Sequence, residues 1–271
     1  NGRTATETLT QSVAIPSTAT TATLTFALHI DTAESYGGGH AEELLGKALH
    51  GYDRSKLVIA SKVSAWNQGY DGVMQACAAS LERIGTDYLD LYLLHRYPEM
   101  GTDIADTMRA MDDLVEQGMV KNIGVCNMSP NRFDATQRHT QNKLVCNQVH
   151  YNVQYREAES RGVLEHAQKN DVLLVAWRPL QKGLLPETSL LVDIAAKYKK
   201  TPTQIAINWL VSQQNVSTLA KTSSLDHLQE NLGALDFVMD PADIERIRIE
   251  YPDQHTVSDA VPLDYAADIS V

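Results

Sequence analysis

The sequence predicts an α/β fold, a (β/α)8 TIM barrel with an atypical or incomplete N-terminal strand and helix. The chain has 271 residues, and about 250 is typical of such a barrel. From residue 28 onward, short apolar runs alternate with amphipathic helical segments, which favours a parallel sheet. Hydrophobic residues make up 43% of the chain, enough for a sizeable core. We therefore expect residues 1–271 to form a single barrel domain.

Seven apolar runs are predicted to be the strands. Most are almost continuously apolar, as is typical of strands buried on both faces. An eighth strand, which would close the barrel, has to come from residues 1–27. The seven runs are Leu28–Asp31, Leu57–Ser61, Leu89–Leu94, Asn122–Cys126, Leu144–His150, Val172–Trp177 and Ser217–Ala220.

Residues 1–27 fit the start of a barrel poorly, because they are rich in threonine and poor in helix formers. Gln11–Ile15 and Thr23–Ala27 are the two candidates for a strand. Pro16–Ala27 is a poor sequence for the crossover helix that a parallel connection needs. We expect residues 1–27 to be irregular.

Helical periodicity fills the segments between the strands. Apolar residues fall on one face from Val73 to Ile84 and again from Ile104 to Val115. Thr201-Pro202 is a good start signal for the last of the periodic segments. Further helices are predicted at His40–Leu49, Arg161–Lys169, Leu190–Tyr198 and Thr203–Val211.

Charge and cysteine content exclude several classes of function. The net charge is −11, whereas a general nucleic-acid binder carries a basic face. No apolar run reaches the roughly 18 residues of a spanning helix, and the N-terminus has no signal-peptide pattern. Cys77, Cys126 and Cys146 are scattered without a C-x-x-C pair, so we expect neither a metal site nor disulfides. We expect a cytoplasmic protein with no nucleic-acid or membrane partner.

Nucleotide and hydrolase motifs are absent from the sequence. A dinucleotide fingerprint starting at Gly37 would need a small residue where Glu42 stands. Gly46-Lys47 is followed by Ala48, so it is not a phosphate-binding loop. There is no G-x-S-x-G elbow and no H-E-x-x-H pair. A nicotinamide enzyme built on this chain would therefore not be of the Rossmann type.

Four titratable residues stand at or just past the ends of three successive predicted strands. Asp31 and Tyr36 follow the first, Lys62 the second and His95 the third. Catalytic groups gather at this face of an α/β barrel. The segments around them carry a specific pattern: Asp31-Thr32-Ala33 with Tyr36-Gly37 and His40–Gly46, the helix Met111–Gly118 leading into Val120–Asn127, and Lys221–Leu225 followed by Glu230-Asn231.

These segments resemble the three signature regions of the aldo-keto reductase family, over about residues 28–250. The resemblance implies NAD(P)H-dependent reduction of aldehydes and ketones, with Asp31, Tyr36, Lys62 and His95 as the catalytic tetrad. A free tyrosine is a feeble acid at neutral pH, but a nearby ammonium stabilises the phenolate. Lys62 can provide that ammonium, held by Asp31, so that Tyr36 donates the proton. His95 can donate a hydrogen bond to the substrate oxygen.

The resemblance also implies a nicotinamide site. Cys126, Asn127 and Gln148 match the residues that bond the carboxamide, since asparagine and glutamine offer both donors and acceptors. The family usually has serine where Cys126 stands, and a thiol is a weaker donor. Trp177 matches an aromatic residue that stacks on the nicotinamide, and Leu180 is placed near the pyrophosphate.

Further along the chain, the resemblance implies the adenosine end of the site. Lys221 and Thr222 match the residues that grip the 2′-phosphate, and Glu230 and Asn231 match the adenine contacts. His227 stands where many NADPH-selective relatives carry arginine. Histidine is mostly neutral near pH 7 and lacks the fork of the guanidinium. We therefore expect NADP(H), with NAD(H) as an alternative.

Substrate choice in this fold lies in the loops after the strands. These loops are short here, with Trp66 and Arg96 as candidate pocket residues. We expect an open pocket for small aldehydes, dicarbonyls or keto sugars. The sequence does not indicate an oligomeric state. Three alternatives remain: a catalytically weak NADP(H)-binding regulatory barrel, a Schiff-base aldolase that uses Lys62, and an inert structural barrel.

Overall fold

The computed structural model describes residues 28–98, 101–185 and 188–264. Within these ranges, seven parallel strands form one sheet in the order β1 to β7, so neighbours in sequence are neighbours in the sheet. All seven predicted strands are confirmed, with ends that differ by no more than two residues. They are β1 (Leu28–Asp31), β2 (Leu57–Val63), β3 (Leu91–Leu94), β4 (Ile123–Cys126), β5 (Leu144–His150), β6 (Leu173–Trp177) and β7 (Val216–Leu219).

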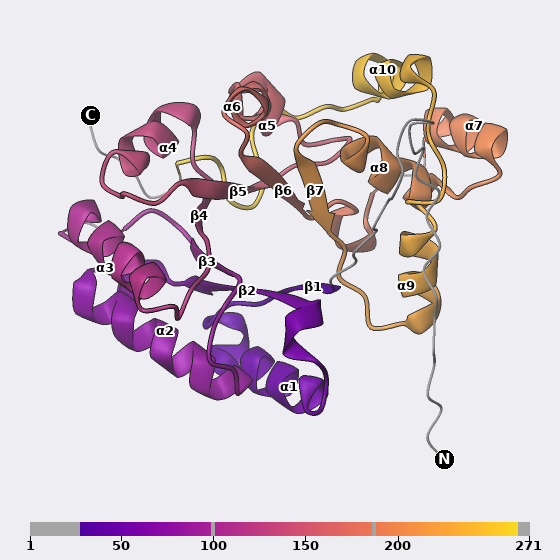
Figure 1. Cartoon of the computed structure of the whole chain (residues 1–271). Helices are drawn as coiled ribbons and strands as arrows, with labels where there is room; N and C mark the ends of the chain where they lie inside the picture. Colours follow the sequence, from indigo (N-terminus) through magenta and orange to yellow (C-terminus); the bar gives the residue numbers. More distant parts are fainter. Residues whose placement is uncertain (1–27, 99–100, 186–187, 265–271) are drawn as a thin grey trace, which may run out of the picture.

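The sheet curls into a nearly closed barrel with helices on its outer side (Figure 1). The predicted fold class is therefore confirmed. Within the described residues, β1 pairs only with β2 and β7 pairs only with β6. The two candidates for the eighth strand, Gln11–Ile15 and Thr23–Ala27, lie outside the described residues.

Helices follow the strands as the alternating pattern predicts. The predicted segment Arg161–Lys169 is shorter in the structure, because Gly162 adopts a left-handed conformation and α6 begins only after it. The sequence did not predict α4, α5 or α10. The helices of the described part are α1 (His40–Leu49), α2 (Tyr70–Ile84), α3 (Ile104–Glu116), α4 (Pro130–Gln137), α5 (Glu157–Ser160), α6 (Val163–Lys169), α7 (Ser189–Tyr198), α8 (Pro202–Val211), α9 (Leu225–Leu232) and α10 (Pro241–Glu250).

Side-chain caps explain where several of these helices begin. Thr201 accepts from the backbone N–H of Gln204, whose side chain in turn accepts from the backbone N–H of Thr201. This reciprocal arrangement satisfies two amides that have no partner inside the helix. Ser129 caps α4 and is followed by Pro130, just as Thr201 caps α8 and is followed by Pro202.

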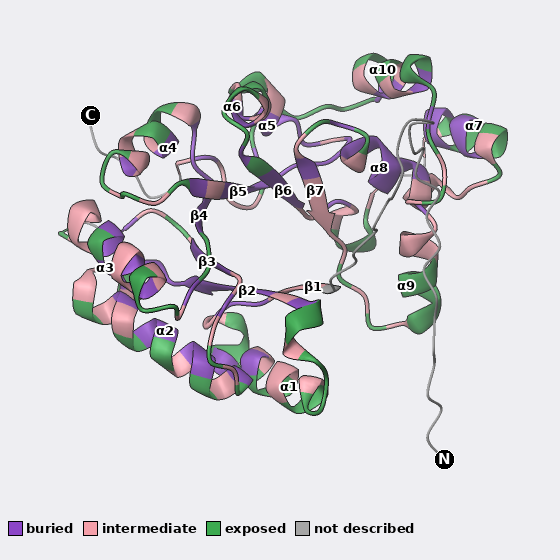
Figure 2. Cartoon of the chain, in the orientation of Figure 1, coloured by how far each residue is buried: buried purple, intermediate pink, exposed green. Residues whose placement is uncertain are grey.

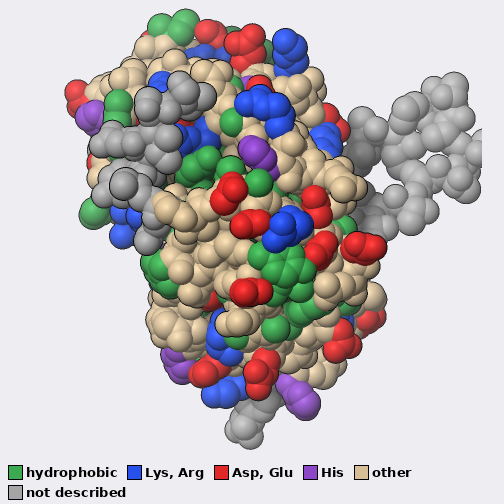
Figure 3. Space-filling model, turned by 90° about the vertical axis from the view of Figure 1, so that its left-hand side faces the viewer, with side chains coloured by type: hydrophobic (Ala, Val, Ile, Leu, Met, Phe, Trp, Pro, Cys, Tyr) green, Lys and Arg blue, Asp and Glu red, His purple; other side chains and the backbone are tan. Residues whose placement is uncertain are grey.

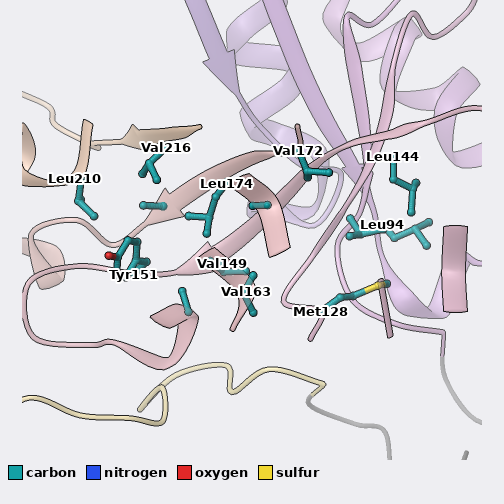
Figure 4. Close-up of a cluster of buried hydrophobic side chains, with 14 of the residues drawn as sticks. Leu94, Met128, Leu144, Val149, Tyr151, Val163, Val172, Leu174, Leu210 and Val216 are labelled. Atoms are coloured by element: carbon teal, nitrogen blue, oxygen red, sulfur yellow. The ribbon is translucent and has the colours of Figure 1, made fainter. Parts of the chain in front are cut away.

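Two apolar layers result from the alternation along the strands. On β2, Ile59 and Val63 join the large core between strands and helices, whereas Ala60 joins a small cluster with Leu91 and Leu93 of β3. Successive side chains of a strand point to opposite faces, so this small cluster fills the barrel interior. Figure 2 shows the buried residues along the strands and the inner faces of the helices, and Figure 4 shows part of the outer layer.

The surface carries charges of both signs. On the face shown in Figure 3, acidic and basic side chains are interspersed. Among the described helices, none combines the length and the apolar content that crossing a bilayer requires.

Two adjacent leucines of β6 allow a test of the outer core. Leu174 is fully buried, whereas Leu173 is 38% exposed. We expect Leu174→Ala to lower the free energy of unfolding by about 2–5 kcal/mol, because it leaves a cavity. Leu173→Ala should cost less than about 1 kcal/mol, since less apolar area is lost. Urea unfolding measures both values, and equal losses would contradict the alternation of buried and exposed side chains along β6.

Candidate active site

A buried ion pair joins β1 and β2 near their carboxyl ends. Lys62 is fully buried, and its Nζ lies 2.5 Å from Oδ1 of Asp31. The same nitrogen donates to the backbone oxygen of Thr32 at 2.8 Å and lies 3.2 Å from the Tyr36 hydroxyl. An ammonium has three N–H donors, so these three contacts use all of them.

The register of the sheet places this pair. Asp31 is paired with Ala60, and Lys62 lies two residues further along β2 on the same face. The sequence prediction placed Lys62 after its strand. That placement was wrong, because β2 continues to Val63 and pairs there with β3. Lys62 therefore points into the barrel interior instead of ending a strand in solvent.

The charges around Lys62 keep it protonated. Burial is the largest single influence and by itself would lower the pKa of Lys62. The carboxylate of Asp31 and the oxygen of Tyr36 act in the opposite direction, and together with the Asp31 hydrogen bond they outweigh burial. The pKa of Lys62 is raised above its ordinary value, so the ammonium form is the one present at neutral pH.

Three consecutive glycines position Tyr36. Gly37, Gly38 and Gly39 have φ values of 61°, 64° and 95°, in the left-handed region that glycine adopts without steric cost. A Cβ on Gly39 would also come within 2.8 Å of Arg83 Cδ. The turn redirects the chain into α1 while the Tyr36 ring, 40% exposed, remains beside Lys62.

His95 follows β3 and completes the group of four. Its ring meets the Tyr36 ring edge to face, with centroids 5.7 Å apart, and its Nδ1 lies 3.4 Å from the Ser35 hydroxyl. Burial, together with the positive charges of Lys62 and Arg96, lowers the pKa of His95 to about 4. The imidazole is therefore neutral at pH 7. The structure brings together all four residues that the sequence proposes as catalytic.

Two of the predicted nicotinamide residues adjoin this group directly. Gln148 Nε2 donates to the second carboxylate oxygen of Asp31 at 2.9 Å. Cys126 Sγ lies 3.9 Å from Oε1 of Gln148. Burial raises the pKa of the Cys126 thiol to about 12, so Cys126 is a protonated, weak donor. Both residues belong to neighbouring strands, β4 and β5, in paired register.

Trp177 and Asn127 form a second pair. The indole Nε1 of Trp177 donates to Oδ1 of Asn127 at 3.1 Å. Asn127 has a φ of 56°, and its backbone oxygen accepts from the N–H of Asp264 at 2.9 Å. Leu180 follows in the next loop and packs, partly buried, against the outer core.

The predicted adenosine residues lie apart from these groups, in and before α9. Ser224 caps α9 through the backbone N–H of His227, whose side chain is exposed, as is Lys221. A carboxylate oxygen of Glu230 accepts from the Thr201 hydroxyl at 2.8 Å. No hydrogen bond in the described part of the chain joins α9 to Asp31. The remaining two residues, Thr222 and Asn231, are partly exposed.

Glu34 is a functional candidate that the sequence did not predict. Its carboxylate accepts from the backbone N–H of Ser64 at 2.6 Å and from Asn67 Nδ2 at 3.0 Å. These bonds tie the loop of Tyr36 to the loop that carries Trp66, which is 65% exposed. The one sequence feature that could have indicated Glu34 is a carboxylate just after the end of a predicted strand.

Arg96 lies in the next loop and is joined to the same side of the barrel. Its backbone oxygen accepts from Gln68 Nε2 at 2.8 Å, and its side chain is exposed. These hydrogen bonds join the loops of Trp66 and Arg96 to each other and to the loop of Tyr36, and the role of the two side chains in a substrate pocket stays a prediction.

A hollow of about 900 Å³ lies elsewhere, among the residues that precede β2 and β3. Its lining includes His50, Tyr52, Arg54 and Tyr88. These residues lie at the opposite ends of the strands from Lys62 and His95. The conserved barrel plan places chemistry at the carboxyl ends, so we assign this hollow no role. Within the described residues, no cluster of His, Cys, Asp or Glu side chains could hold a metal ion.

The sequence model described as "Aldo/keto reductase family" matches residues 10–251. This chain belongs to the aldo-keto reductase family. Methylglyoxal reductase YeaE of Escherichia coli (strain K12) is 34% identical to it over 230 residues, which cover 82% of this chain and 79% of the relative. Glyoxal reductase of Bacillus subtilis (strain 168) is 34% identical over 221 residues, covering 80% and 76%.

Solved structures of aldo-keto reductases are similar in fold as well. A thermostable aldo-keto reductase, Tm1743, in complex with the inhibitor epalrestat has a TM-score of 0.79 and 39% identity, with 81% of each chain covered. An aldo/keto reductase from Klebsiella pneumoniae in complex with NADP and acetate has a TM-score of 0.76 and 31% identity, with 83% of this chain and 80% of that chain covered. The prediction of an NAD(P)H-dependent oxidoreductase of this family is confirmed.

Histidines buried by the fold of this aldo-keto reductase predict how its stability depends on pH. Burial lowers the pKa of His29 as well as those of His95 and His150. Burial is the main cause that lowers the pKa values of His95 and His150 to about 4, from 6.5. Between pH 6.5 and about 4 the folded state therefore binds fewer protons than the unfolded chain. We expect the free energy of unfolding to fall in this window as pH falls, by about 1.4 kcal/mol per pH unit for each histidine.

Urea unfolding at several pH values between 7.5 and 4.5 measures this slope. Replacing His95 by glutamine should make the slope shallower, because one of the histidines with a lowered pKa is lost. His139→Gln, at an exposed position, is the matched control. An unchanged slope in the His95 variant would show that the pKa of His95 is not lowered in the folded wild-type protein.

Proposed function

We propose that this protein reduces the carbonyl group of small aldehydes and ketones with NADPH, and that Tyr36 donates the proton. The single observation that supports this most strongly is the distance of 3.2 Å between Lys62 Nζ and Tyr36 Oη, with Asp31 on the other side of the ammonium. A buried ammonium beside a phenol stabilises the phenolate that remains after proton transfer.

The chain's own residues handle the proton. The Tyr36 hydroxyl gives its proton to the substrate oxygen, and Lys62 offsets the negative charge left on Oη. Asp31 holds Lys62 in its charged form, since an unpaired ammonium at a fully buried position would be strongly disfavoured. When it is bound, NADPH supplies the hydride to the carbonyl carbon.

His95 orients the substrate oxygen. The Ser35 hydroxyl can donate to Nδ1 of the neutral ring, which leaves Nε2 as the N–H that donates. A neutral imidazole donates a hydrogen bond to the oxygen without competing with Tyr36 as the acid. Its low pKa makes this the form present throughout the physiological range.

The residues present fit a nicotinamide carboxamide. Among the described residues, the amide nitrogen of Asn127 has no hydrogen-bond partner, so it is available to donate to a carbonyl oxygen. Oε1 of Gln148 receives only the weak thiol donor, so it can accept from an amide nitrogen. This donor and acceptor match the two ends of a primary amide. Trp177 has one ring face covered by His150 and would offer the other to the nicotinamide.

We propose α-oxoaldehydes as the substrate class. Two relatives are named as methylglyoxal and glyoxal reductases, and both compounds are small dicarbonyls. The exposure of Tyr36 and Trp66 is typical of an open mouth that binds small substrates without strong selectivity.

The Schiff-base alternative is disfavoured by the state of Lys62. An aldolase lysine must be neutral and must reach the carbonyl carbon. Here the pKa of Lys62 is raised, and all three of its N–H donors are engaged. A regulatory barrel without turnover differs from the proposal only in its activity, and the following experiment separates the two.

Tyr36→Phe should keep NADPH affinity within about threefold and lower kcat for methylglyoxal by at least about 100-fold, because the general acid is lost. NADPH oxidation followed by absorbance measures kcat, and quenching of tryptophan fluorescence measures cofactor affinity. Tyr52→Phe, at another exposed tyrosine, is the matched control and should retain wild-type turnover. Full activity in the Tyr36 variant would refute the proposed proton donor. An unmutated protein that binds NADPH but shows no turnover would favour the regulatory barrel.

The choice of cofactor depends on the residues around α9. We expect a preference for NADPH that is weaker than in arginine-bearing relatives, since the exposed His227 lacks a fixed charge. His227→Arg should raise kcat/KM for NADPH relative to NADH by about tenfold through a bidentate phosphate contact. Steady-state kinetics with both cofactors measures this ratio. A wild-type preference for NADH greater than about tenfold, a 1.4 kcal/mol difference, would contradict the assignment.

A further inference from the structure

Four aromatic rings form a continuous stack that begins at Trp177. The Trp177 and His150 rings lie 4.5 Å apart at an interplanar angle of 15°. His150 in turn stacks on Tyr155 at 4.6 Å and 22°, and Tyr155 stacks on His255 at 4.8 Å and 30°. His150 is therefore held between two rings.

The sheet and one turn explain why these rings meet. His150 is the last residue of β5 and is paired with Trp177, the last residue of β6. Side chains at paired positions of neighbouring strands lie side by side on one face. Asn152 then turns the chain, because its Oδ1 accepts from the backbone N–H groups of Gln154 and Tyr155, both at 2.9 Å. The turn brings the Tyr155 ring back onto His150.

Hydrogen bonds at both nitrogens fix the rotation of the His150 ring. Nδ1 lies 2.7 Å from the Ser258 hydroxyl, and Nε2 lies 3.1 Å from Oε1 of Gln181. The Ser258 oxygen already accepts from two backbone N–H groups, those of Ala260 and Val261. Its proton is therefore directed to Nδ1, which leaves Nε2–H to donate to Gln181. The ring is 3% exposed.

Trp177 is restrained in two ways by these neighbours. Its Nε1–H bond to Asn127 fixes the rotation of the indole within its plane. The His150 ring, nearly parallel to the indole, fixes the tilt of that plane. The His150 ring thereby covers one indole face and sets the plane of the indole. The Arg178 guanidinium carbon also lies over the Trp177 ring, 5.6 Å from its centroid.

We propose that His150 is a positioning residue for Trp177. Held by Ser258 and Gln181, it sets the plane of the indole on which the nicotinamide would stack, and it touches neither substrate nor cofactor. The inference rests on the proposed function, because the plane of the Trp177 ring matters only if a nicotinamide stacks on it. Ser258 belongs to the segment after α10, so this late part of the chain takes part in shaping the site.

Variants of His150 separate positioning from simple packing. His150→Ala removes the ring, and we expect it to weaken NADPH binding and to lower kcat by about tenfold each, as the loss of a stacked pair would. His150→Phe keeps a ring in the stack and should restore NADPH affinity to within about threefold of wild type. Ser258→Ala should fall between the two, since the imidazole keeps its stack but loses one hydrogen bond.

Tyr151→Phe is the matched structural control. Tyr151 is the next residue, fully buried, and its hydroxyl is hydrogen-bonded to Gln213, but its ring packs against Trp209 and not Trp177. It should lose stability in urea unfolding while keeping kcat and NADPH affinity. Wild-type kinetics in His150→Ala, or an equal loss in Tyr151→Phe, would overturn the proposal.

Near-ultraviolet circular dichroism of the protein without cofactor tests the inference independently of turnover. The difference between wild type and Trp177→Phe identifies the indole band of Trp177. His150→Ala should change that band, and His150→Phe should largely preserve it. If wild type neither binds NADPH nor reduces methylglyoxal, the proposed function fails. An unchanged Trp177 band in His150→Ala refutes the positioning role alone.

Discussion

The buried ion pair of Lys62 and Asp31 is the constraint on which the rest of the site depends. Either charge alone in the barrel interior would be strongly destabilising, because removing one partner leaves the other uncompensated. The Thr32 carbonyl and the Gln148 amide complete the hydrogen bonding of the pair. The pair also fixes the register of β1 and β2, since a slip of one residue would turn Lys62 toward the helix layer.

The strands were predictable from the sequence because strands buried on both faces leave long apolar runs. The buried position of Lys62 was not predictable, since a lysine after such a run is ordinarily in solvent. It is buried here because its partner Asp31, 31 residues earlier in the chain, balances its charge. Three helices were missed, α4, α5 and α10, although α4 and α10 begin with an N-cap residue followed by proline. Ser129-Pro130 and Asp240-Pro241 have the same form as Thr201-Pro202, which was recognised.

The aromatic support of Trp177 was beyond prediction for a different reason. His150 and Ser258 are 108 residues apart, and neither stands in a periodic pattern or a motif. A histidine at the end of an apolar strand has no sequence feature that marks it as part of a stack. Glu34 is similar, because its partners Ser64 and Asn67 lie in another loop. Such loop-to-loop contacts depend on the barrel having already brought the strand ends together.

The short separations within the Tyr36 group bear on how the protein forms during synthesis. The contacts of Lys62 with Asp31 and Tyr36 span 31 and 26 residues, and Ser35 meets His95 across 60. All of these residues lie between β1 and the loop after β3, whereas Trp177 and Ser258 emerge from the ribosome later. Chains grow at about 5–20 residues per second. Several seconds therefore pass between the synthesis of the residues around Tyr36 and the synthesis of Trp177 and Ser258.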